Sequence, residues 1–146
     1  MPLDPYGLHL DWSIIAAAAK TQCIEIFINF PVQDMNRNVF WRNSDAVDTS
    51  DIERMNRFWG DETWRDAAYS SDGDLFGFEH RTDNETIAEA FYTRLKNVAG
   101  FDFVPRPLPM RNSQNAIVYY LFFASPNSTG GRIVGDIFKK YGSWGG

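Results

Sequence analysis

The sequence predicts an α/β fold with a short mixed sheet, in which one or two parallel strands are joined by an antiparallel C-terminal hairpin. Two observations predict this fold. First, a helical stretch, Trp12–Lys20, is followed by an apolar run, Cys23–Phe30, that Pro31 ends. Loop, helix and strand in this order form the second half of a β-α-β crossover, which joins parallel strands. Second, two strand-like stretches near the end, Phe101–Met110 and Ala116–Ala124, flank a short polar turn and predict the hairpin.

Local signals support each of these elements. In the first helix Ser13 can act as the N-cap, and the alanines and Lys20 favour a helix that ends near that lysine. The run CIEIFINF is rich in β-branched and aromatic residues, so it predicts a central strand with Cys23 as a buried, inert side chain. The stretch AIVYYLFFA is apolar on both faces and should lie inside the sheet. The stretch before it carries three prolines and fits only an edge or an irregular strand: Pro105, Pro107 and Pro109.

The segment 32–82 predicts a helical insertion between the first strand and the long helix described next. Val32–Asn43 is expected to be helical or rich in turns. A helix then begins at Thr49 or Ser50, either of which can cap it, and ends at Gly60. Asp61 is expected to cap a shorter helix that follows.

Two further helices are predicted on either side of the hairpin. The first is Asn84–Val98, ended by Gly100, with one apolar face made of Ile87, Phe91, Leu95 and Val98. The second is Thr129–Tyr141, with three apolar side chains expected on its inner face: Ile133, Ile137 and Phe138. The tail 142–146 is expected to be flexible.

Composition limits the classes of function. A chain of 146 residues has room for one domain, and a net charge of −5 argues against a general phosphate-backbone binder while allowing a local arginine patch. A single cysteine excludes a disulfide within the chain and a cysteine zinc cluster. The two histidines are isolated, so no metal site is expected. The sequence shows no signal peptide and no membrane-spanning run, which makes a cytoplasmic protein the expectation.

Five stretches together carry a family resemblance: LDPYG at 3–7, INFPVQDMNRNV at 28–39, RFWGDETWRDAAY at 57–69, PLPMRNS at 107–113 and VYYLFFAS at 118–125. On these stretches the chain resembles the three-Cys-motif partner protein family, a group similar to class I, Rossmann-like methyltransferases. The resemblance covers only the C-terminal portion of the longer family members. It therefore implies that residues 1–146 form a single truncated methyltransferase-like domain, the C-terminal half of the fold.

The resemblance also implies two catalytic candidates, Asp4 and Tyr6, in the stretch LDPYG. In amino-methyltransferases an acidic residue, a proline and an aromatic residue after a strand bind the target amine and stack the base. Here Tyr6 stands where the second proline of the usual motif would be, which is a departure from that pattern. Taken alone, DPYG is typical of a turn, so the turn and the site both stay open.

Polar residues at two other places are candidate ligand-binding residues. Asn29, Asp34 and Arg37 leave the first strand at its carboxyl end, where ligands bind in open α/β sheets. Arg111 and Asn112 lie in the hairpin turn. The alternative is that Asp34 and Arg37 form a local ion pair and that Arg111 and Asn112 only build the turn.

The chain has no G-x-G turn after a predicted strand, so it is not expected to bind S-adenosylmethionine alone. The resemblance implies that S-adenosylmethionine binds only when a missing N-terminal half is supplied. The favoured function is therefore a binding or assembly module without catalysis of its own. It would form a homodimer through an exposed sheet edge, or a complex with a three-Cys-motif protein that resembles radical S-adenosylmethionine proteins. The alternative is the C-terminal part of a methyltransferase acting on nucleic acid, in which Arg37 and Arg111 contact phosphate.

Overall fold

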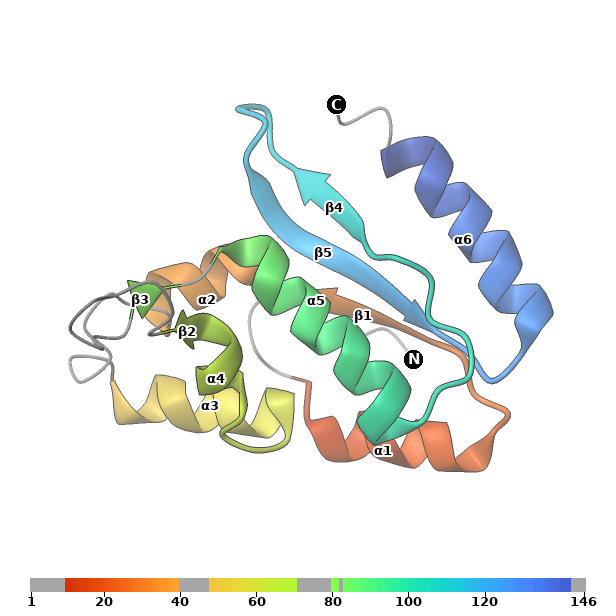
Figure 1. The fold of residues 1–146 in the computed structure, drawn as a ribbon, viewed down its shortest axis with the longest axis horizontal. Coiled ribbons are helices and arrows are strands. Elements are labelled where there is room, and N and C mark those ends of the chain that lie inside the picture. Colours follow the sequence, from red (N-terminus) through yellow and green to blue (C-terminus); the bar gives the residue numbers. More distant parts are fainter. Residues whose placement is uncertain (1–9, 40–47, 71–79, 82, 143–146) are drawn as a thin grey trace.

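A computed structural model describes residues 10–39, 48–70, 80–81 and 83–142, which form a mixed α/β structure (Figure 1). Its main sheet has three strands in the order β1-β5-β4. Their bounds are β1 Ile26–Phe30, β4 Leu108–Arg111 and β5 Ile117–Ala124. A second pairing joins two short strands, β2 Tyr69–Ser70 and β3 His80–Arg81.

The predicted parallel strands are not present among the described residues. β1 pairs antiparallel with β5, so that Ile28 lies opposite Phe122, and β4 also pairs antiparallel with β5. The central strand is therefore β5, and β1 lies at an edge, contrary to the prediction. The order of helix and strand indicates the direction of a crossover, but it does not identify the neighbour of a strand. The neighbour of β1 is β5, which is apolar on both faces and forms the centre of the sheet.

β1 is also shorter than the predicted strand. It begins at Ile26, and Cys23 lies before it in the connection from the first helix. The Cys23 thiol is free and the residue is exposed, so the prediction of a buried cysteine is wrong.

The C-terminal hairpin is confirmed, with β4 on the outer side of β5. Pro109 lies within β4 opposite Tyr120, where an edge strand tolerates a residue without an N–H. The strand is shorter than the predicted Phe101–Met110, because the chain before Leu108 makes only an isolated bridge between Phe103 and Ser125. The two strands are joined by a turn in which Asn115 adopts a positive φ of 65°.

Aspartates cap the first and third helices one or two residues earlier than predicted. α1 spans Trp12–Thr21, and the Asp11 carboxylate accepts a hydrogen bond from the backbone N–H of Ser13 at 3.0 Å. α3 spans Thr49–Trp59 and is capped by Asp48 in the same way. In both cases the aspartate immediately before the helix takes the place predicted for a hydroxyl side chain. The predicted end of α3 at Gly60 is confirmed.

Two short helices complete the described part of the insertion. α2 spans Val32–Asn38, which confirms the first half of the predicted helical segment, and it packs against β5. α4 spans Trp64–Ala68 and packs against the long helix α5.

The long helix ends in a wide turn that changes its apolar face. α5 spans Asn84–Arg94, and a π-helical turn, Leu95–Ala99, continues it to Gly100. Leu95 is fully buried, but Val98 is 59% exposed, so the predicted four-residue face is wrong at its last position. A π turn holds more residues than an α turn, and this rotates Val98 away from the core.

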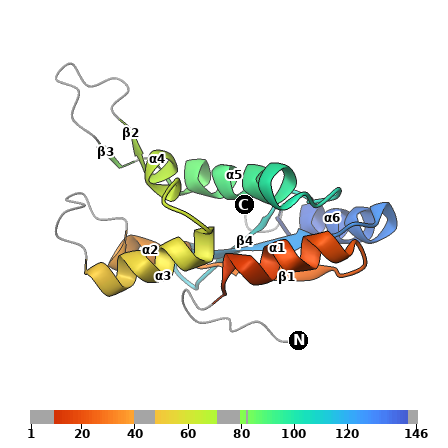
Figure 2. The same cartoon turned by 90° about the horizontal axis from the view of Figure 1, so that it is seen from below.

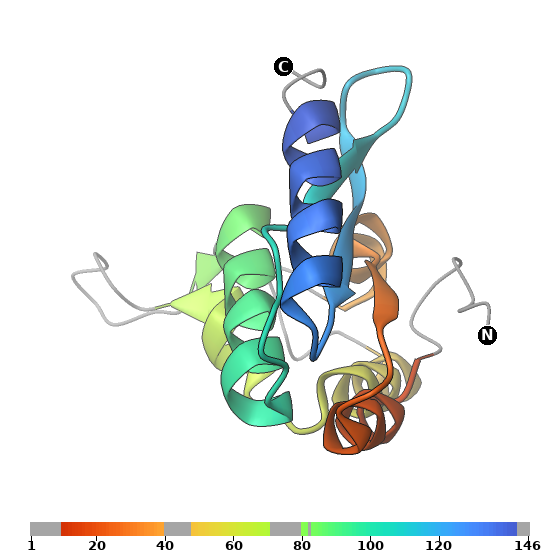
Figure 3. The ribbon, with the colours of Figure 1, turned by 90° about the vertical axis from the view of Figure 1, so that its right-hand side faces the viewer.

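α6 spans Ser128–Gly142 and runs beside the β4–β5 hairpin (Figures 1 and 3). Phe138 is buried as predicted, but Ile133 and Ile137 are 56% and 46% exposed. The helix packs through glycines instead: a Cβ on Gly131 would lie 2.7 Å from Cβ of Phe103. The backbone itself therefore makes the closest approach, and this face is not marked by large apolar residues.

An aromatic cluster fills the space between the sheet and α5. Phe91 on α5 lies at ring-centroid distances of 4.9 Å from Phe30, 5.2 Å from Phe58 and 5.2 Å from Phe122. Seen from below, α4 and α5 form one layer, and α1, α2 and α3 lie at the level of β1 (Figure 2). Strands and helices are therefore held together by one continuous core.

Candidate functional site

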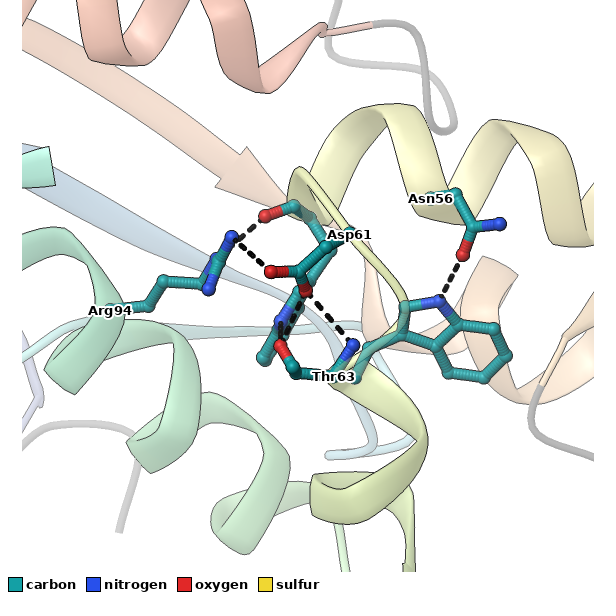
Figure 4. A network of polar contacts seen from close by, with 6 residues as sticks. Asn56, Asp61, Thr63 and Arg94 are labelled. Carbon is teal, nitrogen blue, oxygen red and sulfur yellow. Dashed lines mark hydrogen bonds and ion pairs between the residues drawn. The ribbon is translucent and has the colours of Figure 1, made fainter. Parts of the chain in front are cut away.

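Arg94 on α5 connects three helices through one side chain, and Figure 4 shows its contact with Asp61. Its Nε donates to the carbonyl oxygen of Trp59 at the end of α3 (2.6 Å), and its Nη2 donates to Oδ2 of Asp61 (3.2 Å). The guanidinium carbon lies 4.5 Å from the ring centroid of Trp12 on α1. The side chain is only 11% exposed. Its donors are directed into the protein, which makes Arg94 a structural connection between helices.

Asp61 organises the turn between α3 and α4. Its Oδ1 accepts hydrogen bonds from the backbone N–H and the hydroxyl of Thr63, at 2.9 and 2.5 Å. The same hydroxyl accepts from Nε1 of Trp59 at 2.9 Å, and Nε1 of Trp64 donates to Oδ1 of Asn56 at 2.6 Å. Burial alone would raise the pKa of Asp61, but the hydrogen bonds from Thr63 and the charge of Arg94 leave this pKa below its usual range. Asp61 therefore builds the turn before α4 and does not cap the helix as predicted. The side chains of the stretch RFWGDETW named above make contacts within the fold.

Three of the predicted ligand-binding residues lie at the carboxyl end of β1 and in the helix that follows it. Asn29 is in β1 opposite Leu121, and its Oδ1 is buried. Asp34 lies in the first turn of α2 with its Oδ2 buried, and Arg37 lies exposed in the last turn. These residues lie at the end of a strand as predicted, but that strand is an antiparallel edge strand and not a parallel central one. Their role as ligands stays a prediction.

The other two predicted residues form hydrogen bonds within the hairpin turn. Nη1 of Arg111 donates to the carbonyl oxygen of Asn115 at 3.0 Å. Oδ1 of Asn112 accepts from the backbone N–H groups of Gln114 and Ala116, at 2.9 and 3.1 Å. These bonds are those of turn residues. They do not test whether either side chain also contacts a ligand.

The structure places both sets at the same end of the sheet. Phe30, the last residue of β1, pairs with Tyr120, and Arg111, the last residue of β4, pairs with Ile117. Because β1 and β4 each run antiparallel to β5, they run in the same direction and their carboxyl ends lie together. This is the end at which the sequence predicts a ligand crevice.

Tyr120 was not singled out from the sequence, yet it lies buried at this end of the sheet. Burial raises the pKa of Tyr120, and the charges of Glu85 and Asp83 at the start of α5 raise it further, while Arg111 opposes them. The phenol is therefore a neutral hydrogen-bond donor at neutral pH. The sequence signal for it is weak, a pair of tyrosines inside an otherwise apolar strand.

The two edges of the sheet differ in how they are protected. β4 carries Pro109 and Arg111, and α6 packs alongside it. β1 has the sequence IFINF, without a charge or a proline, and among the described strands it pairs only with β5. Phe27 on β1 is 48% exposed, although its ring lies 4.8 Å from that of Phe123. Ile24, just before the strand, is 43% exposed. β1 is thus an apolar edge without the usual protective residues.

Other kinds of site receive no support within the parts of the chain that the structure describes. No group of three acidic, histidine or cysteine side chains is arranged to hold a metal ion. No described helix is long and apolar enough to cross a bilayer. The two catalytic candidates, Asp4 and Tyr6, lie outside the described residues.

Comparisons with known proteins found no similar protein at any of three levels. No family model matches the chain, no curated protein matches its sequence, and no solved structure matches its fold.

Proposed function

We propose that this chain is a binding and assembly module without catalysis of its own, and that the edge of β1 is its assembly surface. One observation carries the proposal, namely the contrast between the two sheet edges. An exposed strand edge presents backbone N–H and C=O groups that pair readily with another strand, and proteins usually protect such edges with charges, prolines or covering elements. β4 has all three kinds of protection, whereas IFINF has none of them among the described residues.

The occupant we propose for this edge is a second copy of the chain, paired antiparallel about a twofold axis. With the axis at Ile28, Ile26 would lie opposite Phe30 of the second copy, and Phe27 would lie opposite its Asn29. The core-facing side chains Ile26, Ile28 and Phe30 would then extend both cores across the junction. The two sheets would join into one sheet of six strands. Closed twofold pairing removes the edge in both copies at once, which is the reason to favour it over an open chain of subunits.

The methyltransferase-like identity of the module is part of the same proposal. It is supported by the resemblance over five stretches, by the terminal antiparallel hairpin, and by β1 and β4 running in the same direction on either side of β5. The first half of such a fold, which would hold S-adenosylmethionine, is not represented in the described elements. We therefore expect no tight one-to-one binding of S-adenosylmethionine when the chain is titrated by calorimetry, and such binding would contradict a module without a cofactor.

The assembly proposal can be tested by light scattering after size-exclusion chromatography. We expect the wild-type chain to elute with twice its chain mass of 16.7 kDa. A Phe27→Lys variant places a charge beside the edge and should elute as a monomer. Val98→Lys is the matched control, because it replaces another exposed apolar residue, one that lies in the π-helical turn after α5 and not on β1. It should remain a dimer.

Two results would count against the proposed dimer. A wild-type chain that stays monomeric at high concentration would contradict the dimer. It would indicate that the edge pairs with a different protein, such as the three-Cys-motif partner. Equal dissociation of the Phe27 and Val98 variants would show that the interface lies elsewhere.

A second function is the C-terminal part of a methyltransferase that acts on nucleic acid. The observation that favours it is the gathering of polar side chains at the carboxyl ends of β1 and β4, with Tyr120 and Arg111 close enough to influence each other electrostatically. In this case another part of the same enzyme would pair with β1 and supply the S-adenosylmethionine site. Transfer of a labelled methyl group to nucleic acid by the chain together with such a part would favour this function over the module.

A further inference from the structure

A groove of about 480 Å³ lies between α6 and the proline-rich segment that leads into β4. A second hollow of about 450 Å³ shares Pro105 and Arg132 with it, so the two hollows lie next to each other. Gly135 lines the first hollow, where a Cβ would approach Cβ of Pro105 to 3.3 Å. We call the two adjacent hollows together the α6 groove.

The α6 groove is positively charged although the chain as a whole is acidic. Four cationic side chains line it, and they come from three parts of the chain: Lys96, Arg106, Arg132 and Lys139. Only two carboxylates line it, Asp102 and Asp136. The groove therefore carries two more cations than carboxylates, while the whole chain has a net charge of −5. A cleft lined by one sign of charge concentrates ligands of the opposite sign.

Most of these cations are not neutralised by the protein. Among the described residues, Arg132 and Lys139 make no ion pair, and both are exposed. Arg106 pairs with Glu89, but both side chains are more than half exposed, and an exposed ion pair contributes little. Their charges are thus available to an anionic ligand.

Two planar groups, an arginine and an aromatic ring, lie among the charged side chains of the groove. The guanidinium of Arg106 lies 4.6 Å from the ring centroid of Tyr92, and its side chain is largely exposed. Phe103, in the second hollow, is 38% exposed. Bases of single-stranded nucleic acids stack on exposed aromatic rings and on arginine planes, while phosphates contact the cations between them.

We propose that the α6 groove binds a short single-stranded nucleic acid, with phosphates on Arg132 and Lys139 and a base on Phe103. An acidic peptide would match the charges but would leave the ring of Phe103 without a planar partner. The hollow lined by Pro107 and Pro109 lies along β4, at the opposite edge of the sheet from β1, and no residue of β1 lines either hollow. This proposal is therefore independent of assembly through β1, and either can fail without the other.

The test is fluorescence anisotropy with a fluorescein-labelled 12-nucleotide single strand, made once as DNA and once as RNA, over 0.05–0.3 M salt. We count one phosphate contact for each of the four cations that line the groove, with Lys96 and Arg106 added to Arg132 and Lys139. The logarithm of the association constant should then fall against the logarithm of salt concentration with a slope of about −2.8. Replacing both Arg132→Ala and Lys139→Ala should reduce the slope to about −1.4. Each phosphate contact raises the association constant about fivefold at 0.1 M salt relative to 1 M salt. The loss of two contacts should therefore lower the affinity about 25-fold.

The matched control replaces Lys20→Ala and Lys140→Ala, two exposed lysines of which neither lines the groove. It makes the same change in net charge and should leave the affinity within about twofold of the wild type. A Phe103→Leu variant keeps an apolar side chain but removes the ring, and should weaken binding about tenfold. Phe27→Lys should bind normally.

Three results would overturn the proposal. One is the absence of binding by the wild-type chain at 0.05 M salt. Another is an equal loss of affinity in the two double variants, which would indicate a general charge effect. The third is displacement of the strand by oligoglutamate of equal charge at equal concentration, with no effect of Phe103→Leu, which would assign the groove to acidic peptides.

Discussion

Replacing Arg94 by methionine should destabilise the fold far more than the same replacement of an exposed arginine. Methionine keeps much of the apolar stem but removes the hydrogen bond to the carbonyl oxygen of Trp59 and the charge over Trp12. A hydrogen bond from a charged donor contributes about 1.5–3 kcal/mol, and the cation–ring contact about 0.5–1 kcal/mol. The ion pair to Asp61, whose carboxylate is 47% exposed, adds less than about 1 kcal/mol. We expect a loss of about 2–4 kcal/mol.

Guanidinium unfolding followed by tryptophan fluorescence measures this loss, because Trp12 and Trp59 both contact the arginine. For a chain of this length the melting temperature should fall by about 6–12 °C. Arg106→Met is the matched control, since Arg106 also lies over a ring and makes an ion pair, but its side chain is 66% exposed. It should lose less than about 1 kcal/mol. Equal losses in the two variants would refute the structural role given to Arg94.

Three other predictions concern single side chains. Gly60→Ala should lose at least about 2 kcal/mol more than Gly100→Ala in chemical unfolding. Both glycines have positive φ, but only at Gly60 would the new Cβ lie 2.5 Å from the Trp12 ring. Ser125→Ala should lose about 1–3 kcal/mol in the same assay, because the buried hydroxyl donates to Glu25 at 2.8 Å. The backbone N–H of Ser13 lowers the pKa of Asp11, so its contribution to stability is present above about pH 4 and is lost as the pH falls through the lowered pKa. An Asp11→Asn variant, which keeps a cap, should therefore show a shallower decline of stability between about pH 5 and pH 2, and an unchanged decline would contradict this assignment.

Local sequence signals predicted the elements that depend on short-range chemistry. Gly60 and Gly100 end helices with positive φ, and Pro109 lies in an edge strand, as their residue types predict. The caps were misplaced by one or two residues because Asp11 and Asp48 precede the hydroxyl residues that also suit a cap. Such errors are small because the competing signals lie side by side in the chain.

Features that depend on distant contacts could not be predicted. The neighbour of β1 is β5, which lies about ninety residues later in the chain, and the helix–strand pattern favoured a parallel neighbour instead. The inner face of α6 is formed largely by glycines, whereas a count of apolar side chains selects Ile133 and Ile137. An unpaired sheet edge was expected, and among the described strands the pairing order leaves β1 at such an edge.

The candidate sites show the same difference between short-range and long-range sequence signals. Asn29, Asp34 and Arg37 were predicted as ligand residues because they lie at the end of a strand or just after it, and this role stays a prediction. Tyr120 and the α6 groove were missed, because the charges around them come from segments far apart in sequence. Lys96 and Arg132, for example, meet only after α5 and α6 have packed against the same segment.

The wide turn at Leu95–Ala99 gives the chain a tolerance to changes in length. It accommodates one surplus residue at the end of a helix while Leu95 and Phe101 both stay buried, and the backbone N–H of Phe101 reaches the carbonyl oxygen of Leu95 at 3.1 Å. Removing one residue at Lys96–Val98 would let the turn tighten to ordinary α-helical spacing without moving the residues on either side. Related chains that differ by one residue at this point would therefore share the same core, and an insertion or deletion here would be nearly neutral during evolution.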